Sequence, residues 1–378
     1  MMLTEIEELK TGCRFRNGLL DCLEKPKLSE SGLEIDNFLF DKWRNLNDLW
    51  FYETKRLYGT NPIDHIANLF LSNKYRKSST LKVADADFRQ NLITKITNIV
   101  NKNKPITLVM PSFPFKSGNF AKCQRRLPDL AEVASLCRLW EITQQAEYIY
   151  KPGMQIIILS DGVMLSDVFN IRPYFCKIYL QTVEHWIRLM GMESRIKIFD
   201  LNSLLQKHFP DFNVEVDKEI LLLKNNLKPE DVSRLYYSLR LNYDNTLWLQ
   251  EFATMCLNNF SPEVAVKLLE RRDSEVGHKI FEYKSLWNTV EHLGVIESLF
   301  PDHIRATPHT FKHDNKLTLH LVNENTIILP WMGVGVVKYS GSLGHGVITV
   351  KYEHEVNHEK SIPIFIQGEE TPFGYILN

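Results

Sequence analysis

The sequence predicts an α/β fold: a Rossmann-like, largely parallel central sheet flanked by helices, with a helical N-terminal segment and a β-rich C-terminal region. Three apolar runs in the middle of the chain alternate with segments of helical periodicity, a pattern typical of β-α-β units. The first 80 residues space their aromatic and aliphatic side chains as helices do. We therefore divide the chain into a helical extension (1–80), an α/β core with a helical insert (81–303) and a β-rich region packed on that core (304–378).

The elements of the core follow one another in order. Pro128 precedes one helix, which carries Asp129 and Glu132 in its first turn, where the helix dipole favours carboxylates. Another helix opens at Pro173 and closes at Gly191. We expect a helix at about 86–103, a strand at 104–111, a helix at about 129–150, a strand within 151–162, a helix at about 173–190, a strand at 195–201 and helices over 217–295.

The C-terminal region differs in character. Short runs such as KLTLHLV, GVGVVKY, VITVKYEHEV and SIPIFIQ are β-rich and are separated by Gly, Asn and Pro. We expect a mostly antiparallel β region that extends or caps the central sheet.

Composition excludes several classes of partner. The 378 residues contain 45 Lys+Arg and 46 Asp+Glu, without the basic excess of a nucleic-acid binder. No apolar run approaches the ~20 residues that span a bilayer, and the polar start MMLTEIEELK is unlike a signal peptide. Six cysteines form no C-x-x-C pair, as expected of reduced, mostly buried thiols. We expect a cytoplasmic globular protein with no nucleic-acid or membrane partner.

Two motifs invite a metal interpretation that their context disfavours. His354-Glu355-Val356-Asn357-His358 matches H-E-x-x-H, but zinc binding needs this string on a helix, and its flanks alternate as strands do. We expect the polar tip of a hairpin. His303, His309, His313 and His320 match no ligand spacing. No G-x-x-x-x-G-K-[ST] loop and no G-x-S-x-G elbow occurs, so we expect no metal site and no nucleotide fingerprint.

Polar residues of both signs follow consecutive predicted strands. PSFPFKSGN (111–119) follows the first strand, and SDGVMLSD (160–167) follows the second. Ligands of parallel α/β sheets bind outside the carboxyl ends of the strands. These segments, with LPDLAE (127–132), are the candidate functional site. Solvated or capping residues remain the alternative for each segment alone.

These motifs resemble one family. PSFPFKSGN, LPDLAE, YKPG (150–153) and SDGVMLSD are similar to the conserved strings of the isocyanide (isonitrile) synthases of pyoverdine/dityrosine biosynthesis, the PvcA-like enzymes. The similarity covers roughly 85–335. This chain departs from the family at two places. It has Ala306-Thr307-Pro308-His309 where a Ser-Ile-His-like string is expected, and it has Met332 after Pro-Trp where a His is expected. These departures point to altered substrate choice or a changed reaction.

The resemblance implies an enzyme that condenses the amine of Tyr or Trp with ribulose 5-phosphate to an isonitrile, without a cofactor. Some relatives are associated instead with N-formyl-tyrosine, and a non-catalytic binding member is a further alternative. An iron/2-oxoglutarate oxygenase is the expected pathway partner. The expected catalytic residues are Lys116, Asp129, Glu132, Asp161 and His309. The expected substrate-binding residues are Phe113, Phe115, Asn119, Arg125, Arg126, Ser160, Asp167, Arg271, Arg272, Arg305 and Trp331.

Overall fold

The computed structural model describes residues 13–15, 61–77, 84–244, 262–309, 316–339, 346–366 and 371–377. Most of the predicted helical extension (1–80) lies outside these ranges. Within it, α3 (Pro62–Leu71) is helical, as expected, whereas β1 (Cys13–Phe15) is a strand. Asn61 caps α3, since its side chain accepts a hydrogen bond from the Ile63 backbone N–H at 3.0 Å.

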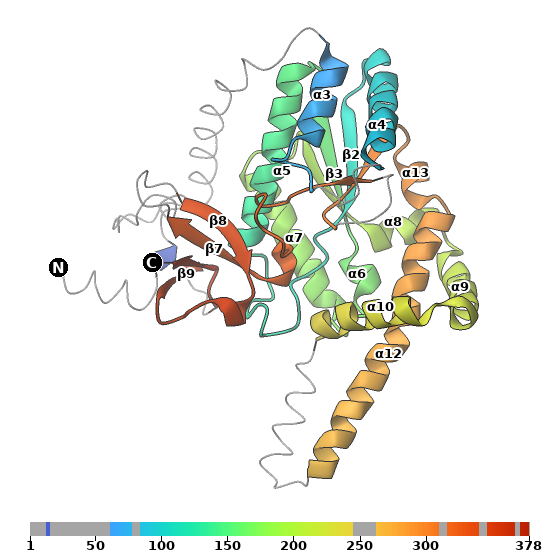
Figure 1. Ribbon diagram of the computed structural model, residues 1–378, viewed down its shortest axis with the longest axis vertical. Coiled ribbons are helices and arrows are strands. Elements are labelled where there is room, and N and C mark those ends of the chain that lie inside the picture. Colours follow the sequence, from blue (N-terminus) through green and yellow to red (C-terminus); the bar gives the residue numbers. More distant parts are fainter. Residues whose placement is uncertain are drawn as a thin grey trace, which may run out of the picture.

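A five-stranded parallel sheet forms the centre of the molecule (Figure 1). Its strands are β2 (Ile106–Pro111), β3 (Met154–Ser160), β4 (Ile196–Asp200), β5 (His303–Thr307) and β6 (Leu317–Thr318), in the order β4-β3-β2-β5-β6. All pairings within it are parallel, so the predicted fold class is confirmed. The order reverses between β2 and β5, which places a topological switch point at their carboxyl ends.

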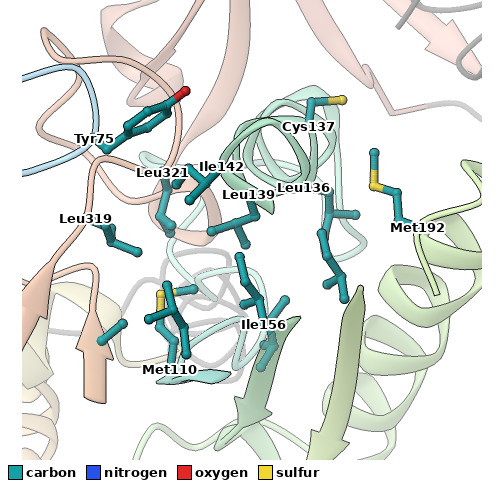
Figure 2. Close-up of a cluster of buried hydrophobic side chains, with 14 of the residues drawn as sticks. Tyr75, Met110, Leu136, Cys137, Leu139, Ile142, Ile156, Met192, Leu319 and Leu321 are labelled. Carbon is teal, nitrogen blue, oxygen red and sulfur yellow. The ribbon is translucent and has the colours of Figure 1, made fainter. Parts of the chain in front are cut away.

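The alternation of side chains along β2 and β3 builds two cores. Ile106, Leu108 and Met110 lie on one face of the sheet, in a cluster with α5 (Leu130–Ile149) and α7 (Pro173–Leu189). Figure 2 shows this cluster, with Leu136, Leu139 and Ile142 of α5 near Met110 and Ile156. α4 (Ala84–Asn101) contributes to the same cluster.

Val109, Ile157 and Leu159 face the other way, into a second cluster. The helices that cover this face are α6 (Gly162–Leu165), α8 (Leu201–His208), α9 (Phe212–Asn226), α10 (Pro229–Asn242), α12 (Pro262–His292) and α13 (Val295–Leu299). The predicted helical insert over 217–295 therefore closes one face of the sheet. In Figure 1, α10 and the first part of α12 lie below α6, beyond the carboxyl end of β3.

A second five-stranded sheet packs against α5. Its strands are β7 (Val334–Tyr339), β8 (Gly346–Lys351), β9 (Ser361–Ile366), β10 (Gly374–Leu377) and β1, in the order β1-β9-β10-β7-β8. Side chains at Gly335 and Gly374 would lie within 3.0 Å of Leu130, so β7 and β10 approach the start of α5 closely. Because α5 lies between two sheets, it is buried on nearly all sides.

β5 begins at the expected boundary at 303, and β6 lies beyond it at the edge of the central sheet, so part of the C-terminal region extends that sheet, as expected. Two expectations for this region need correction. The second sheet is mixed, because β1 pairs with β9, and β10 with β7, in parallel. Residues 353–355 form a 3-10 turn between β8 and β9, which are not paired with each other, so the H-E-x-x-H string is not a hairpin tip.

The polar residues of the string, His354, Glu355, Asn357 and His358, are exposed, as expected of a solvated turn, and the preceding residue anchors the turn. Glu353 is buried and accepts a hydrogen bond from the Tyr375 hydroxyl. The backbone N–H groups of Glu353 and His354 donate to the carbonyls of Lys122 and Ala121. The turn therefore docks on the loop that follows residue 119.

We predict that Gly162→Ala destabilises the protein by about 3 kcal/mol or more. A Cβ at Gly162 would lie 1.8 Å from the carbonyl oxygen of Pro114, which would force apart the loops after β2 and β3. Gly277→Ala in α12 is the matched control: its Cβ meets nothing within 4 Å, and Ala in a helix interior stabilises by about 0.5–1 kcal/mol. Urea unfolding measures both, and equal stabilities would contradict the prediction.

Candidate active site

A fully buried lysine lies beneath the carboxyl end of β2. The Lys116 ammonium donates hydrogen bonds to Glu132 Oε2 at 2.8 Å and to the carbonyls of Pro330 and Gly333 at 2.7 and 2.8 Å. Asp129 Oδ2 lies 2.9 Å from the same nitrogen. The three charged side chains have no exposed surface. One cation therefore joins the loop after β2, the start of α5 and the 330–333 turn.

The helix start holds the two carboxylates in place. Asp129 is the N-cap of α5 and accepts a hydrogen bond from the Ala131 N–H at 2.7 Å, while Glu132 Oε2 accepts one from the Asp129 N–H at 2.8 Å. This is a capping box. The Tyr179 hydroxyl donates to Glu132 Oε1 at 3.0 Å. Helix capping thus aims both carboxylates at Lys116.

Burial and charge set the protonation of this centre. Burial alone lowers the pKa of Lys116, but the attraction of Asp129 and Glu132 outweighs it and raises that pKa. Burial raises the pKa of Asp129 to about 7, partly offset by Lys116. The structure brings together three of the five residues expected to be catalytic, at a position that a substrate does not reach in this conformation.

Asp161 occupies the carboxyl end of β3. It is buried, and its Oδ1 has no hydrogen-bond partner among the described residues. Burial raises its pKa to about 7. Its charge contributes to raising the pKa values of Tyr283 and Cys176, so both side chains lie near it. A carboxyl group that titrates near neutral pH is suited to accept and return protons.

The loops around Asp161 hold each other closely. The Ser160 hydroxyl donates to the Phe113 carbonyl at 2.8 Å. Phe113 itself has a positive φ of 56°, an uncommon conformation for a bulky residue that is often found at functional sites. Ser160 therefore serves to join the two loops.

A pocket of about 660 Å³ lies beside α6 and the start of α7. Among its lining residues are two that the sequence predicts for substrate binding, Arg126 and Asp167. Arg172, Asp244 and Lys279 supply its other charges, and its apolar lining consists of Ile171, Pro173, Phe175 and Tyr243. Lys279 is one helical turn from Tyr283 on α12, so the pocket and Asp161 adjoin the same face of that helix.

Arg126 is committed to a partner in the pocket wall. Its Nη1 and Nη2 donate to the two carboxylate oxygens of Asp244 at 2.5 and 3.0 Å. The rings of Phe120 and Phe175 lie 5.9 and 5.2 Å from the guanidinium, within cation–π range. The predicted residue Asn119 donates to the Leu241 carbonyl at 3.2 Å. These contacts fix the end of α10 as one wall of the pocket.

The other predicted arginines do not line this pocket. Arg125 donates to the Pro128 carbonyl at 2.9 Å and is buried beside α5. Arg305, buried in β5, pairs with Glu291 at 3.1 Å. On α12, Arg271 and Arg272 pair with Glu275 and Asp273.

The aromatic residues expected to line a substrate pocket are buried in the two cores. The rings of Phe113 and Trp331 lie 5.4 Å apart in the first cluster, and those of Phe115 and Phe169 lie 5.4 Å apart in the second. The expected catalytic His309 is exposed after β5, and its N–H donates to Thr307 Oγ1 at 3.2 Å. The structure places His309 outside the lining of the described pocket.

Metal and membrane interpretations find no support in the described part of the chain. It contains no group of three or more His, Cys, Asp or Glu side chains that could hold a metal ion; His313 lies outside it. Across the described residues, no helix combines the length and the apolar character needed to cross a bilayer. Cys123, Cys137 and Cys176 are buried free thiols, as expected.

We predict that Lys116→Met lowers the free energy of unfolding by about 3–5 kcal/mol, because it leaves two buried carboxylates without their cation. Lys102→Met, which removes only a half-exposed ion pair with Asp302, serves as control and should melt close to the wild type. Adding Asp129→Asn and Glu132→Gln to Lys116→Met should recover part of the loss. Chemical denaturation measures all variants, and a wild-type midpoint for Lys116→Met would refute the role assigned to this centre.

The raised pKa of Asp161 predicts a pH-dependent stability. In the folded state the carboxyl titrates near 7, against about 4 when unfolded. Between these values the folded protein binds more protons, so the Asp161 contribution is present below pH 4 and is lost as pH rises through 7. The Asp161→Asn variant should therefore gain stability relative to the wild type between pH 4 and 8. Urea unfolding across this range tests it, and a pH-independent difference would contradict the assigned pKa.

Comparison with known proteins places these features in a family. The model of the family described as "Pyoverdine/dityrosine biosynthesis protein" matches residues 96–360. The chain is 26% identical over 258 residues to an L-tyrosine isonitrile synthase of Xenorhabdus nematophila, covering 64% of this chain and 71% of that protein. It is 22% identical over 236 residues to L-tryptophan isonitrile synthase AmbI2 of Fischerella ambigua, covering 61% and 67%.

The fold is similar to a solved structure. The crystal structure of the PvcA protein from Pseudomonas aeruginosa aligns with a TM-score of 0.61 and 21% identity, over 84% of this chain and 100% of that chain. The family model confirms the predicted resemblance, and the solved structure supports the fold. Since the family model matches well over half of the sequence, the chain belongs to the pyoverdine/dityrosine biosynthesis protein family.

Proposed function

We propose that the protein is an isonitrile synthase that condenses the amine of an aromatic L-amino acid, Tyr or Trp, with ribulose 5-phosphate. The names of its relatives support the reaction class. The observation that carries the proposal within this chain is Asp161, a buried carboxyl with an unpartnered oxygen at the end of β3 and a pKa near 7. Asp161 belongs to the motif SDGVMLSD (160–167), which runs from the end of β3 to the pocket residue Asp167.

The proposed chemistry needs repeated proton transfer. The amine attacks the C2 ketone only when deprotonated, and loss of water then gives an imine. The imine rearranges, and the C1–C2 and C2–C3 bonds of the sugar break. C1 leaves as formaldehyde, C3–C5 leave as a three-carbon fragment (hydroxyacetone plus phosphate), and the former C2 becomes the isonitrile carbon, so that no external oxidant or reductant is needed. A carboxyl near half-ionisation at neutral pH both takes and returns protons without a large energetic penalty. Asp161 is our candidate for this role.

Lys116, Asp129 and Glu132 have a different place in the proposal. Their side chains have no exposed surface and bond to one another or to backbone groups. We assign them to positioning: they fix the loop after β2, whose Pro114 carbonyl contacts the segment that begins with Gly162. They act on Asp161 through the backbone of these loops.

Lys279 and Arg126 are the cations that we assign to the phosphate of ribulose 5-phosphate. Both line the pocket, although each also pairs with a carboxylate, Glu282 at 2.6 Å and Asp244 respectively. A pocket of about 660 Å³ is in the range of small-molecule sites. We further propose a cytoplasmic location and an iron/2-oxoglutarate oxygenase that modifies the product.

The experiment incubates the pure protein with Tyr or Trp and ribulose 5-phosphate and follows products by mass spectrometry. We predict an isonitrile from one of them. Asp161→Asn should lower kcat at least a hundredfold while retaining a cooperative unfolding transition, and Asp217→Asn, at an exposed site on α9, should remain active. If neither amino acid reacts while an active relative does under the same conditions, the proposed function is wrong.

The same assay decides the closest alternative. The spore wall maturation protein DIT1 of Saccharomyces cerevisiae is 42% identical to this chain over 66 residues, which is 18% of the chain. Production of an N-formyl amino acid with no isonitrile intermediate at early times would favour a formamide-forming enzyme. Ribulose 5-phosphate labelled at C2 should give either product with the label, which shows that its new carbon comes from the sugar. The mass of the labelled product then tells an isonitrile from an N-formyl amino acid.

A further inference from the structure

The charges that line the pocket fall into two groups. Arg126 is engaged by both oxygens of Asp244, and Lys279 pairs with Glu282 at 2.6 Å. Asp167 and Arg172 remain. Both are exposed, and neither forms an ion pair with another described residue. The pocket therefore presents one negative and one positive side chain that no other described residue neutralises.

The backbone holds these two residues in a defined loop between α6 and α7. The Asn170 N–H donates to the Asp167 carbonyl at 3.3 Å, and the Phe175 N–H donates to the Arg172 carbonyl at 2.9 Å. Asn170 has a positive φ of 54°, and Pro173 starts α7. Since the turn is bonded at both ends, the carboxylate and the guanidinium start from fixed backbone positions.

The remaining lining of the pocket is mostly apolar, with Ser166 and Asn170 as its uncharged polar residues. Ile171, Pro173, Phe175 and Tyr243 offer an aliphatic and aromatic surface beside the two charges. A ligand that satisfies all of these groups carries an ammonium, a carboxylate and an apolar or aromatic group. Asp167 and Arg172 themselves do not suit a sugar phosphate, because Asp167 repels its negative charge. They are therefore left for the second substrate, beside the phosphate that we assign to Arg126 and Lys279.

We propose that Asp167 and Arg172 form the site for the zwitterionic part of the amino-acid substrate. Arg172 binds the α-carboxylate through its planar guanidinium, Asp167 binds the α-ammonium, and the side chain packs on Phe175 and Tyr243. The inference rests on the proposed function, which it deepens by assigning the amino acid to this pocket. Only α6 and Ser166 separate Asp167 from the proposed base Asp161 along the chain.

Binding of substrate fragments tests this assignment without turnover. Isothermal titration calorimetry compares L-tyrosine with tyramine, which lacks the carboxylate, and with 3-(4-hydroxyphenyl)propionate, which lacks the amine; the matching indole series serves if the protein prefers Trp. For the wild type, each fragment should bind at least tenfold more weakly than the amino acid. Arg172→Gln should weaken the amino acid about tenfold or more and leave tyramine unchanged.

Asp167→Asn should weaken the amino acid to a similar extent and leave the propionate unchanged. Arg188→Gln, at an exposed position near the end of α7, is the control and should bind all three ligands like the wild type. The proposal is overturned if both pocket variants bind the amino acid as the wild type does, or if each variant weakens all three ligands equally.

Failure of this site and failure of the proposed function give different results. Isonitrile formation with unchanged amino-acid KM in both variants removes the site and leaves the function. The converse outcome is that a non-aromatic amino acid binds and no aromatic one does. If the two variants then lose affinity for it selectively, as described above, the zwitterion site is supported and the aromatic substrate is rejected.

Discussion

The burial of the Lys116 ammonium is the constraint on which the rest of the structure depends. An ammonium without exposed surface is tolerated only when its charge and its protons are satisfied. Glu132, Pro330 and Gly333 accept its three hydrogen bonds, and Asp129 adds a second negative charge. These partners come from α5 and from the turn before β7. The lysine therefore fixes the relative position of the two sheets and of the helix between them.

This arrangement divides the family motifs into two layers. Lys116, Asp129 and Glu132 have no exposed side-chain surface, Asp161 is buried, and Asp167 lines the pocket. Motif residues that bind no substrate still constrain the site, because the loop that they hold contacts Gly162 at the start of α6. Strict residue requirements thus arise at positions remote from the chemistry as well as next to it.

Periodicity and helix-start signals were sufficient to predict much of the fold. The strands β2, β3 and β4 and the helices α4, α5 and α7 begin and end within a few residues of the expected positions. β5 was harder to identify, since His303 and Arg305 interrupt an apolar pattern although both are buried. Each has a partner, the Phe300 carbonyl for His303 and Glu291 for Arg305. The pairing of Arg305 with Glu291 of α12 leaves no local signal in the sequence.

Contacts between residues far apart in the sequence also limit how much of the candidate site can be predicted. The motifs located Asp161, Asp167 and Arg126, but nothing in the sequence pairs Arg126 with Asp244, which lies 118 positions later. Arg172 and Lys279 were missed because a charge beside a helix start or on a helix face has a common solvated alternative. Lys116 differs from the pocket residues in being fully buried. Its burial depends on the turn before the second sheet and therefore on tertiary structure.

The long span of the Lys116 contacts has a consequence for how the chain folds during synthesis. Its carbonyl partners at Pro330 and Gly333 lie 214 and 217 residues further along. Until those residues leave the ribosome, the Lys116 ammonium lacks two of its three hydrogen-bond acceptors, so the loop after β2 cannot close over the first core as it does in the folded protein. The nascent α/β core is thus held incomplete for most of translation, at about 5–20 residues per second, with apolar surface that a chaperone would need to shield.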